Sequence, residues 1–130
     1  MPAPVSPSRI KQIALPVTSV EKAKAFYRDV LGLRHLFDAP PALTFFDCGG
    51  VRLMLAGPEA QGKDGPTQHA VLFYDVSDIK SAHAAIKAAG APSHSEPHII
   101  ARMNGREVWI AELGDGEGNF VGLMSEVPES

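Results

Sequence analysis

The sequence predicts an α+β fold built from two repeated modules, each consisting of a strand, a helix and about three further strands. Two observations predict this. A strand that runs into a helix and ends at glycine occurs twice, with Val17 and Val76 at equivalent positions 59 residues apart. In each copy, short apolar segments separated by turn residues follow the helix. Two such units imply an internal pseudo-two-fold repeat, with a site between the modules.

The first module begins with a strand and a helix. Ile13, Leu15 and Val17 alternate with the residues between them, which is the period of a strand with one more apolar face. Ser19 can cap the next helix, whose apolar residues recur at helical spacing up to Gly32, where it should end. Gly49-Gly50 is typical of a two-residue hairpin. Three short strands are expected after the helix, over 34–38, 43–48 and 51–56.

The second module repeats this plan. Asp78 can cap a helix of small apolar residues, which indicates close packing on a sheet, and Gly90 ends it. His83 lies on this helix between charged neighbours and is expected to be solvated. Asn104-Gly105 is a strong hairpin sequence. Strands are expected over 97–103, 106–113 and 119–126.

The chain fits one domain of ordinary size, with enough length for a core. Residues 1–7 contain three prolines and no periodic pattern, so we expect a flexible tail there. The single domain is then expected over 8–130. Within it we expect the first module at about 8–57, a linker at about 58–67 and the second module at about 68–127.

Composition narrows the class of protein. Hydrophobic residues make up 45% and charged residues 21% of the chain, which is typical of a soluble globular protein. The net charge is −3 without a run of basic residues, so we expect no nucleic-acid partner. No apolar stretch reaches the ~20 residues that span a bilayer, and no secretion signal is evident, so we expect no membrane partner. The lone Cys48 cannot form an internal disulfide, and together with the lack of a recognisable secretion signal it favours a cytoplasmic location.

The chain resembles the vicinal oxygen chelate superfamily, which includes glyoxalase I, bleomycin-resistance proteins, fosfomycin-resistance enzymes and extradiol dioxygenases. The resemblance extends over about 9–126. It is carried by Ile13–Val17, Ala25–Leu33, Phe46–Leu53, Val76–Ile79 and the turn Gly116–Asn119. It implies two βαβββ modules in which mixed sheets curl into a cup with the helices outside. It also implies a homodimer, because small two-module relatives usually pair.

The resemblance places metal ligands on the cup-facing positions of the first and fourth strands of each module. Carried over one by one, these positions are Gln12, Leu53, Val71 and Gly122. Only Gln12 offers an oxygen or nitrogen donor, whereas a catalytic divalent metal usually has at least three protein ligands. His69 lies two residues before Val71 and would raise the donors to two. We therefore expect neither a metal nor another cofactor.

Alternation from these positions predicts a cup lined with apolar side chains. Gly122, beside an aromatic ring, would leave room for a planar ligand. The expected ligand-binding residues are Gln12, Leu53, His69, Val71, Phe73, Trp109, Phe120, Gly122 and Met124. Trp109 can face the cup or the helix, because the register of its strand is not determined. In the alternative interpretation, these side chains fill the cup as core.

The favoured function is metal-free binding of a small, partly apolar or aromatic molecule, by a protein of the bleomycin-resistance kind or a carrier. The alternative is an enzyme: a lyase, isomerase or dioxygenase of the glyoxalase type. It would use Gln12, His69 and His98 or Glu112 as polar groups. The loss of donors at the metal positions favours the first interpretation.

Overall fold

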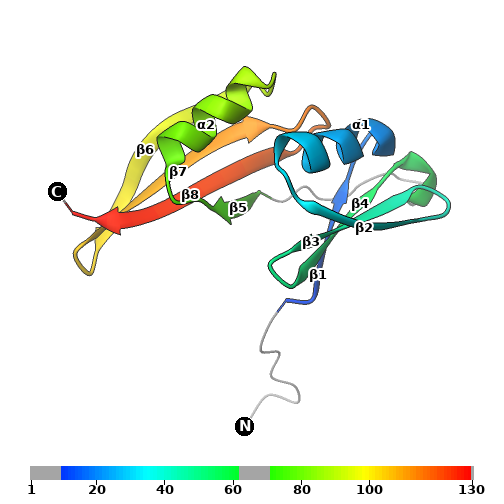
Figure 1. The fold of residues 1–130 in the computed structure, drawn as a ribbon, viewed down its shortest axis with the longest axis horizontal. Helices are drawn as coiled ribbons and strands as arrows, with labels where there is room; N and C mark the ends of the chain where they lie inside the picture. The colour runs from blue at the N-terminus through cyan, green and yellow to red at the C-terminus, as the bar shows by residue number, and fades with distance from the viewer. Residues whose placement is uncertain (1–9, 62–70, 130) are drawn as a thin grey trace, which may run out of the picture.

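The computed structural model describes residues 10–61 and 71–129. It contains two four-stranded mixed sheets, each covered on one face by a helical segment. Figure 1 shows both helices on the same side of the molecule. His69, a predicted ligand contact, lies outside the described residues.

The first module has the predicted strand–helix–strand order. Its elements are β1 (Gln12–Pro16), α1 (Val20–Ala25), η1 (Phe26–Val30), β2 (Arg34–Ala39), β3 (Leu43–Cys48) and β4 (Val51–Ala56), followed by the short turn η2 (Pro58–Ala60). The sheet order is β1-β4-β3-β2, with β1 parallel to β4 and the other pairs antiparallel. Ser19 caps α1 as predicted, since its hydroxyl accepts a bond from the Lys22 amide.

The helix of this module differs from the regular helix that the spacing predicts. After Ala25 it continues as η1, a π-helical turn in which the Leu31 amide donates to the Phe26 carbonyl at 3.1 Å. Gly32 then takes a φ of 72°, in the left-handed region, and ends the helical segment. Tyr27 lies within this π-helical turn and is buried in the core at 1% exposure.

The second module consists of β5 (Leu72–Asp75), α2 (Ile79–Ala88), β6 (Ser93–Met103), β7 (Arg106–Gly114) and β8 (Phe120–Pro128), in the sheet order β5-β8-β7-β6. The long β6 starts at Ser93, before the predicted start at Pro97. Pro97 fits because β6 is an edge strand whose register shifts between Ser95 and His98. The prediction of a solvated His83 is wrong. The residue is 4% exposed, and its Nε2 lies 2.9 Å from Ser93 Oγ.

The hydrophobic core lies between each sheet and its helix. Leu15, Tyr27 and Phe46 are central to the first part, and Ala111 and Leu123 to the second. Phe26 and Leu31 pack against both parts and so connect the modules. The opposite face of each sheet is not covered by a helix, and we call it the open face. In the described part of the chain, no helix is both long and apolar enough to span a bilayer.

Candidate functional site

Strand register shows which side chains share the open face of the first module. Residues paired across a sheet point to the same side, so each row of partners can be followed from strand to strand. One row, here called the polar row, consists of Arg34, Asp47, Arg52 and Gln12 on β2, β3, β4 and β1. The next, here called the apolar row, consists of Phe37, Phe45, Met54 and Ala14.

The polar row is held together by side-chain contacts. Arg52 Nε donates to Gln12 Oε1 at 2.6 Å, and Gln12 Nε2 lies 3.8 Å from Met54 Sδ. The Asp47 carboxylate accepts a bond from the Gly50 amide at 3.3 Å and lies 3.8 Å from the Arg34 guanidinium. Gln12 thus lies on this face, and its side-chain oxygen is hydrogen-bonded to Arg52.

The apolar row carries a stacked aromatic pair. The Phe37 and Phe45 rings lie 4.5 Å apart between centroids, with 23° between their planes. The guanidinium carbon of Arg52 lies 5.4 Å from the Phe45 centroid, within cation–π range. Phe45 is 7% exposed, whereas Phe37 is 46% exposed. The outer ring therefore presents an aromatic surface to solvent beside a guanidinium.

The placement of Leu53 on the same face as Gln12 is wrong. Leu53 pairs with Ile13, is 2% exposed and packs in the core with Tyr27. The face carries Met54 instead, which pairs with Ala14 in the way that Gly122 pairs with Phe73 in the second module. Aligning Gly49 with Gly118 in sequence would make Leu53 equivalent to Gly122, whereas the strand pairing makes Met54 equivalent to Gly122. Because side chains alternate, this one-residue offset reverses the face.

The open face of the second module carries several predicted residues. Phe73, Gly122 and Glu112 are partners across β5, β8 and β7, and Met124 lies in the next row, opposite Ile110. Phe120 is 40% exposed and stacks on His94 with 4.3 Å between centroids. This face is therefore aromatic, with Glu112 as a polar member.

Gly122 does not leave the vacant space that its small size suggests. A Cβ atom built there would lie 2.5 Å from Phe73 Cδ1 and 2.9 Å from the Leu72 carbonyl oxygen. The Phe73 ring therefore lies directly against the glycine and occupies the position expected for a planar ligand. The remaining outer side of this ring is exposed, at 42% for the residue.

Trp109 lies on the helix-covered face. It pairs with Ser125 and packs with the core residues beneath α2. Lys80 Nζ lies 5.1 Å from the centroid of the ring, and the indole nitrogen donates to Glu107 Oε1 at 3.2 Å. Of the two placements open for Trp109, the structure has the one toward the helix, on the face opposite Phe73 and Met124.

A cavity of about 270 Å³ between the modules is lined by Leu53, Val71 and Phe73, three of the predicted residues. Cys48 and Tyr74 line both this cavity and a larger one, of about 540 Å³, near α2. Burial raises the pKa of the Cys48 thiol, which consequently stays protonated at neutral pH and is a poor nucleophile. These cavities are mostly apolar.

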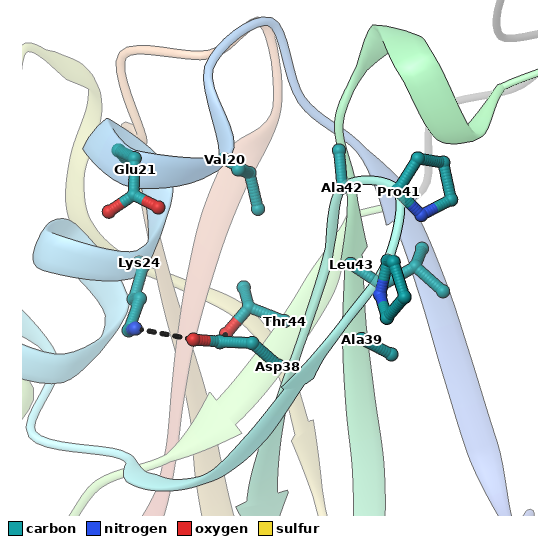
Figure 2. A pocket seen from close by; sticks show the side chains of 10 residues that line it. Val20, Glu21, Lys24, Asp38, Ala39, Pro41, Ala42, Leu43 and Thr44 are labelled. Atoms are coloured by element: carbon teal, nitrogen blue, oxygen red, sulfur yellow. Dashed lines mark hydrogen bonds and ion pairs between the residues drawn. The ribbon is translucent and has the colours of Figure 1, made fainter.

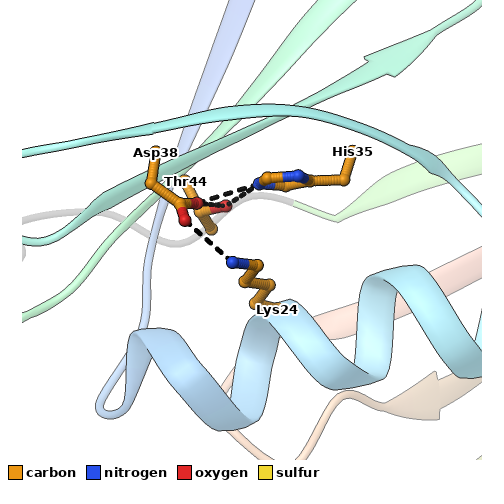
Figure 3. Close-up of polar contacts among 4 residues, drawn as sticks. All are labelled: Lys24, His35, Asp38 and Thr44. Atoms are coloured by element: carbon orange, nitrogen blue, oxygen red, sulfur yellow. Dashed lines mark hydrogen bonds and ion pairs between the residues drawn. The ribbon is translucent and has the colours of Figure 1, made fainter.

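A separate hollow of about 250 Å³ lies between α1 and the β2–β3 connection (Figure 2). Lys24, Asp38 and Thr44 line it, and Figure 3 shows these three polar side chains together with His35, which contacts Asp38 and Thr44. Lys24 Nζ donates to Asp38 Oδ2 at 2.8 Å and Thr44 Oγ1 donates to Asp38 Oδ1 at 2.7 Å. His35 Nε2 lies 2.9 Å from Asp38 Oδ1.

This group is not arranged for nucleophilic catalysis. The Thr44 hydroxyl is buried and donates its proton to Asp38, and His35 contacts both groups through a single ring nitrogen. A catalytic triad instead uses the two ring nitrogens for different partners. Bonds from Lys24 first, and then from Thr44 and His35, hold the pKa of Asp38 well below its usual range. The group therefore joins α1 to the β2–β3 hairpin.

The residues at the family's metal positions do not fit a catalytic divalent metal. With the corrected register they are Gln12, Met54, Val71 and Gly122, which provide one amide, one thioether and no carboxylate or imidazole. In the described ranges 10–61 and 71–129, no group of three or more His, Cys, Asp or Glu side chains could hold a metal ion.

Comparison with known proteins identifies the family. A family model described as "Glyoxalase/Bleomycin resistance protein/Dioxygenase superfamily" matches residues 9–119. The chain belongs to this superfamily. The two mixed sheets with outer helices have the fold of its solved members. None of the curated proteins matches the sequence.

Several solved structures resemble most of the chain. Lactoylglutathione lyase from Agrobacterium tumefaciens is 26% identical, with a TM-score of 0.74 over 92% of this chain and 95% of that one. A glyoxalase/bleomycin resistance protein/dioxygenase superfamily member from Sphaerobacter thermophilus is 20% identical, with a TM-score of 0.72 over 91% and 97%. A glyoxalase-related enzyme from Fulvimarina pelagi is 16% identical, with a TM-score of 0.74 over 90% and 87%.

Proposed function

We propose that this superfamily member binds a small, partly apolar or aromatic molecule on the open faces of its sheets, without a metal. It acts as a sequestering protein of the bleomycin-resistance kind or as a carrier. The exposed aromatic rings of Phe37, Phe73 and Phe120 carry this proposal, since each is at least 40% exposed. We place the protein in the cytoplasm, where its single cysteine remains reduced.

The surroundings of these rings support a binding role. Clustered exposed apolar side chains mark interaction sites, and small-molecule sites combine such side chains with a few polar anchors. Gln12 and Arg52 are anchors of this kind in the first module, and Glu112 is one in the second. Binding without a metal is supported by the residues at the four positions where the superfamily places its metal ligands. These residues provide one amide and one thioether, which are weak replacements for carboxylates and imidazoles.

A titration with a neutral aromatic probe, 2-naphthamide, tests this function. Binding should perturb the NMR amide signals of open-face residues. Phe37→Ala should weaken binding at the first module, and Phe73→Ala binding at the second, at least threefold because each removes a ring contact. The indole signal of Trp109 on the opposite face should not move. No saturable binding at millimolar probe, or perturbation confined to the helix-covered face, would contradict the proposal.

We also propose that the protein is a homodimer. β1 and β5 are edge strands with one unpaired side, and their sheets expose aromatic open faces, which a second copy would protect. Light scattering should give twice the 13.8 kDa chain mass at micromolar concentration. A monomer mass across a wide concentration range would overturn this assignment.

An enzymatic alternative is a lyase of the glyoxalase type. It is favoured by the solved lactoylglutathione lyase at 26% identity and by the positions of two polar side chains. Glu112 pairs with Gly122, and His98 pairs with Ile110 one row away, so both lie on the open face as general acid–base candidates. Formation of lactoylglutathione that Glu112→Gln abolishes would establish this function, and absence of turnover in the native protein would exclude it.

A further inference from the structure

We propose that the ligand of the open face is an anion whose carboxylate or phosphate-type group pairs with Arg52, while its aromatic body lies on Phe37. This inference rests on the proposed binding function and specifies the chemical class of the ligand. It follows from the charges and contacts of the polar and apolar rows.

Arg52 carries a positive charge without an acidic partner. Among the residues that the structure describes, no carboxylate forms an ion pair with its guanidinium. The nearest candidate in the row, Asp47, is engaged by Arg34 and the Gly50 amide. With two arginines and one aspartate, the polar row has a surplus of one positive charge.

The guanidinium is held in place by contacts that do not neutralise it. Gln12 accepts the bond from Nε at 2.6 Å, and the Phe45 ring supports the guanidinium carbon at 5.4 Å. The two terminal nitrogens make no hydrogen bond to any described residue, so they can donate in parallel to two oxygens of one anionic group. This fork geometry matches carboxylate and phosphate, and the fixed side chain lowers the entropy lost on binding.

The position of Phe37 in the apolar row sets the size of the ligand. Phe37 lies two strands away from Arg52, and the 5.4 Å from the guanidinium carbon to the Phe45 centroid and the 4.5 Å from there to the Phe37 centroid limit their separation to about 10 Å. An ion pair with Arg52 covers about 4 Å of this span, so an acidic group joined to an aromatic body of two rings reaches Phe37. Phe37, stacked on Phe45 and exposed on its outer side, offers the surface for that body.

The second module carries the opposite charge on its open face. Glu112 lies in the row of Phe73, Asp75 in the row of Met124 and Glu126 in the row of Val108. These carboxylates outnumber Arg106, the basic residue that β7 places on the same face. An anionic group is therefore attracted to the polar row of the first module and repelled by the second module. A cationic ligand would show the reverse preference.

A matched pair of probes isolates the charge. Naphthalene-2-carboxylate and 2-naphthamide share the ring system and differ in charge. We expect the native protein to bind the carboxylate at least tenfold more tightly than the amide, since charge-assisted bonds are the stronger kind. Arg52→Met should abolish this preference while retaining the affinity for 2-naphthamide within about threefold. Phenylphosphonate should compete with the carboxylate.

Arg34→Met is the control variant, because it makes the same substitution in the same row at an ion-paired and 74% exposed side chain. It should leave the preference within about threefold of the native value. Equal binding of both probes by the native protein overturns the anionic class and leaves the proposed binding function standing. Loss of the preference in both variants also overturns the role of Arg52. Failure of both probes to bind overturns the binding function itself, and this inference with it.

Discussion

Gly122 and Phe73 show how a single residue determines the shape of the open face. A glycine within a strand leaves a gap in the face, and the aromatic ring of the partner strand covers it. The ring is therefore held against the β8 backbone and leaves its outer side available to a ligand. Any side chain at position 122 must displace the ring, because an added Cβ would approach it more closely than van der Waals contact allows.

We expect Gly122→Ala to destabilise the protein by about 1 to 3 kcal/mol through this overpacking. The double variant Gly122→Ala with Phe73→Ala should recover part of the loss, because the displaced ring is absent. Chemical denaturation of the native protein, both single variants and the double variant gives the coupling energy. Strictly additive effects would show that the ring does not constrain position 122.

Asp38 makes stability depend on pH at the junction of α1 and β2–β3. Its carboxylate has a pKa well below the usual value, so its ionised form stabilises the folded state. This contribution is complete above the ordinary carboxyl pKa of about 3.9 and decreases as the pH falls below it. Asp38→Asn should therefore lower the free energy of unfolding at pH 7, and the difference from native should shrink progressively below about pH 4. Denaturation curves across this range measure it.

Asp29→Asn is a suitable control for Asp38→Asn. The pKa of Asp29 is also lowered, through its bond with the adjacent Arg28, but both side chains are exposed. Arg28 and Asp29 are neighbours in sequence and remain close in the unfolded chain. Their ion pair therefore contributes little to the free-energy difference between the folded and unfolded states. An equal pH-dependent loss in the two variants would contradict the assigned role of Asp38.

At the scale of elements, local sequence patterns predict the fold better than the site. The alternation of Ile13 and Leu15, the Ser19 cap and the Asn104-Gly105 turn are local features, and they predicted strands, helix and hairpin. Which residue of β4 lies beside Gln12 depends on a parallel pairing across 40 residues, which alternation within a strand does not determine.

The sequence pattern did not identify several open-face residues, because their placement depends on pairing between distant strands. Arg52, Met54 and Phe45 share the open face only because β1, β3 and β4 pair in one particular register. The sequence does contain one clue, since Arg52 and Met54 alternate with the apolar Val51, Leu53 and Leu55, as expected for a strand with one buried face. Trp109 has no comparable clue, because apolar residues occupy both faces of β7.

At the scale of the whole molecule, a buried polar cluster joins the two modules. The turn between β7 and β8 inserts Asp115, Glu117 and Asn119, all at most 7% exposed, against the β1–α1 connection. Thr18 donates to Glu117 at 2.8 Å, and Asn119 donates to the Pro16 carbonyl at 2.9 Å. Because buried polar groups are costly without partners, these bonds favour one relative placement of the modules.

Tyr27 provides the test of this connection, because its hydroxyl donates to Asp115 Oδ2 at 2.9 Å across the module boundary. Tyr27→Phe keeps the ring and removes the bond, so a buried carboxylate loses a donor. We expect a loss of about 1.5 to 3 kcal/mol in the free energy of unfolding, the range for hydrogen bonds to charged groups.

Tyr74→Phe is the matched control, since the buried Tyr74 hydroxyl has no hydrogen-bond partner among the described residues. That variant should be neutral or slightly more stable. Denaturation of both variants under identical conditions compares a paired with an unpaired hydroxyl, and equal losses would show that the bond to Asp115 does not contribute to joining the modules.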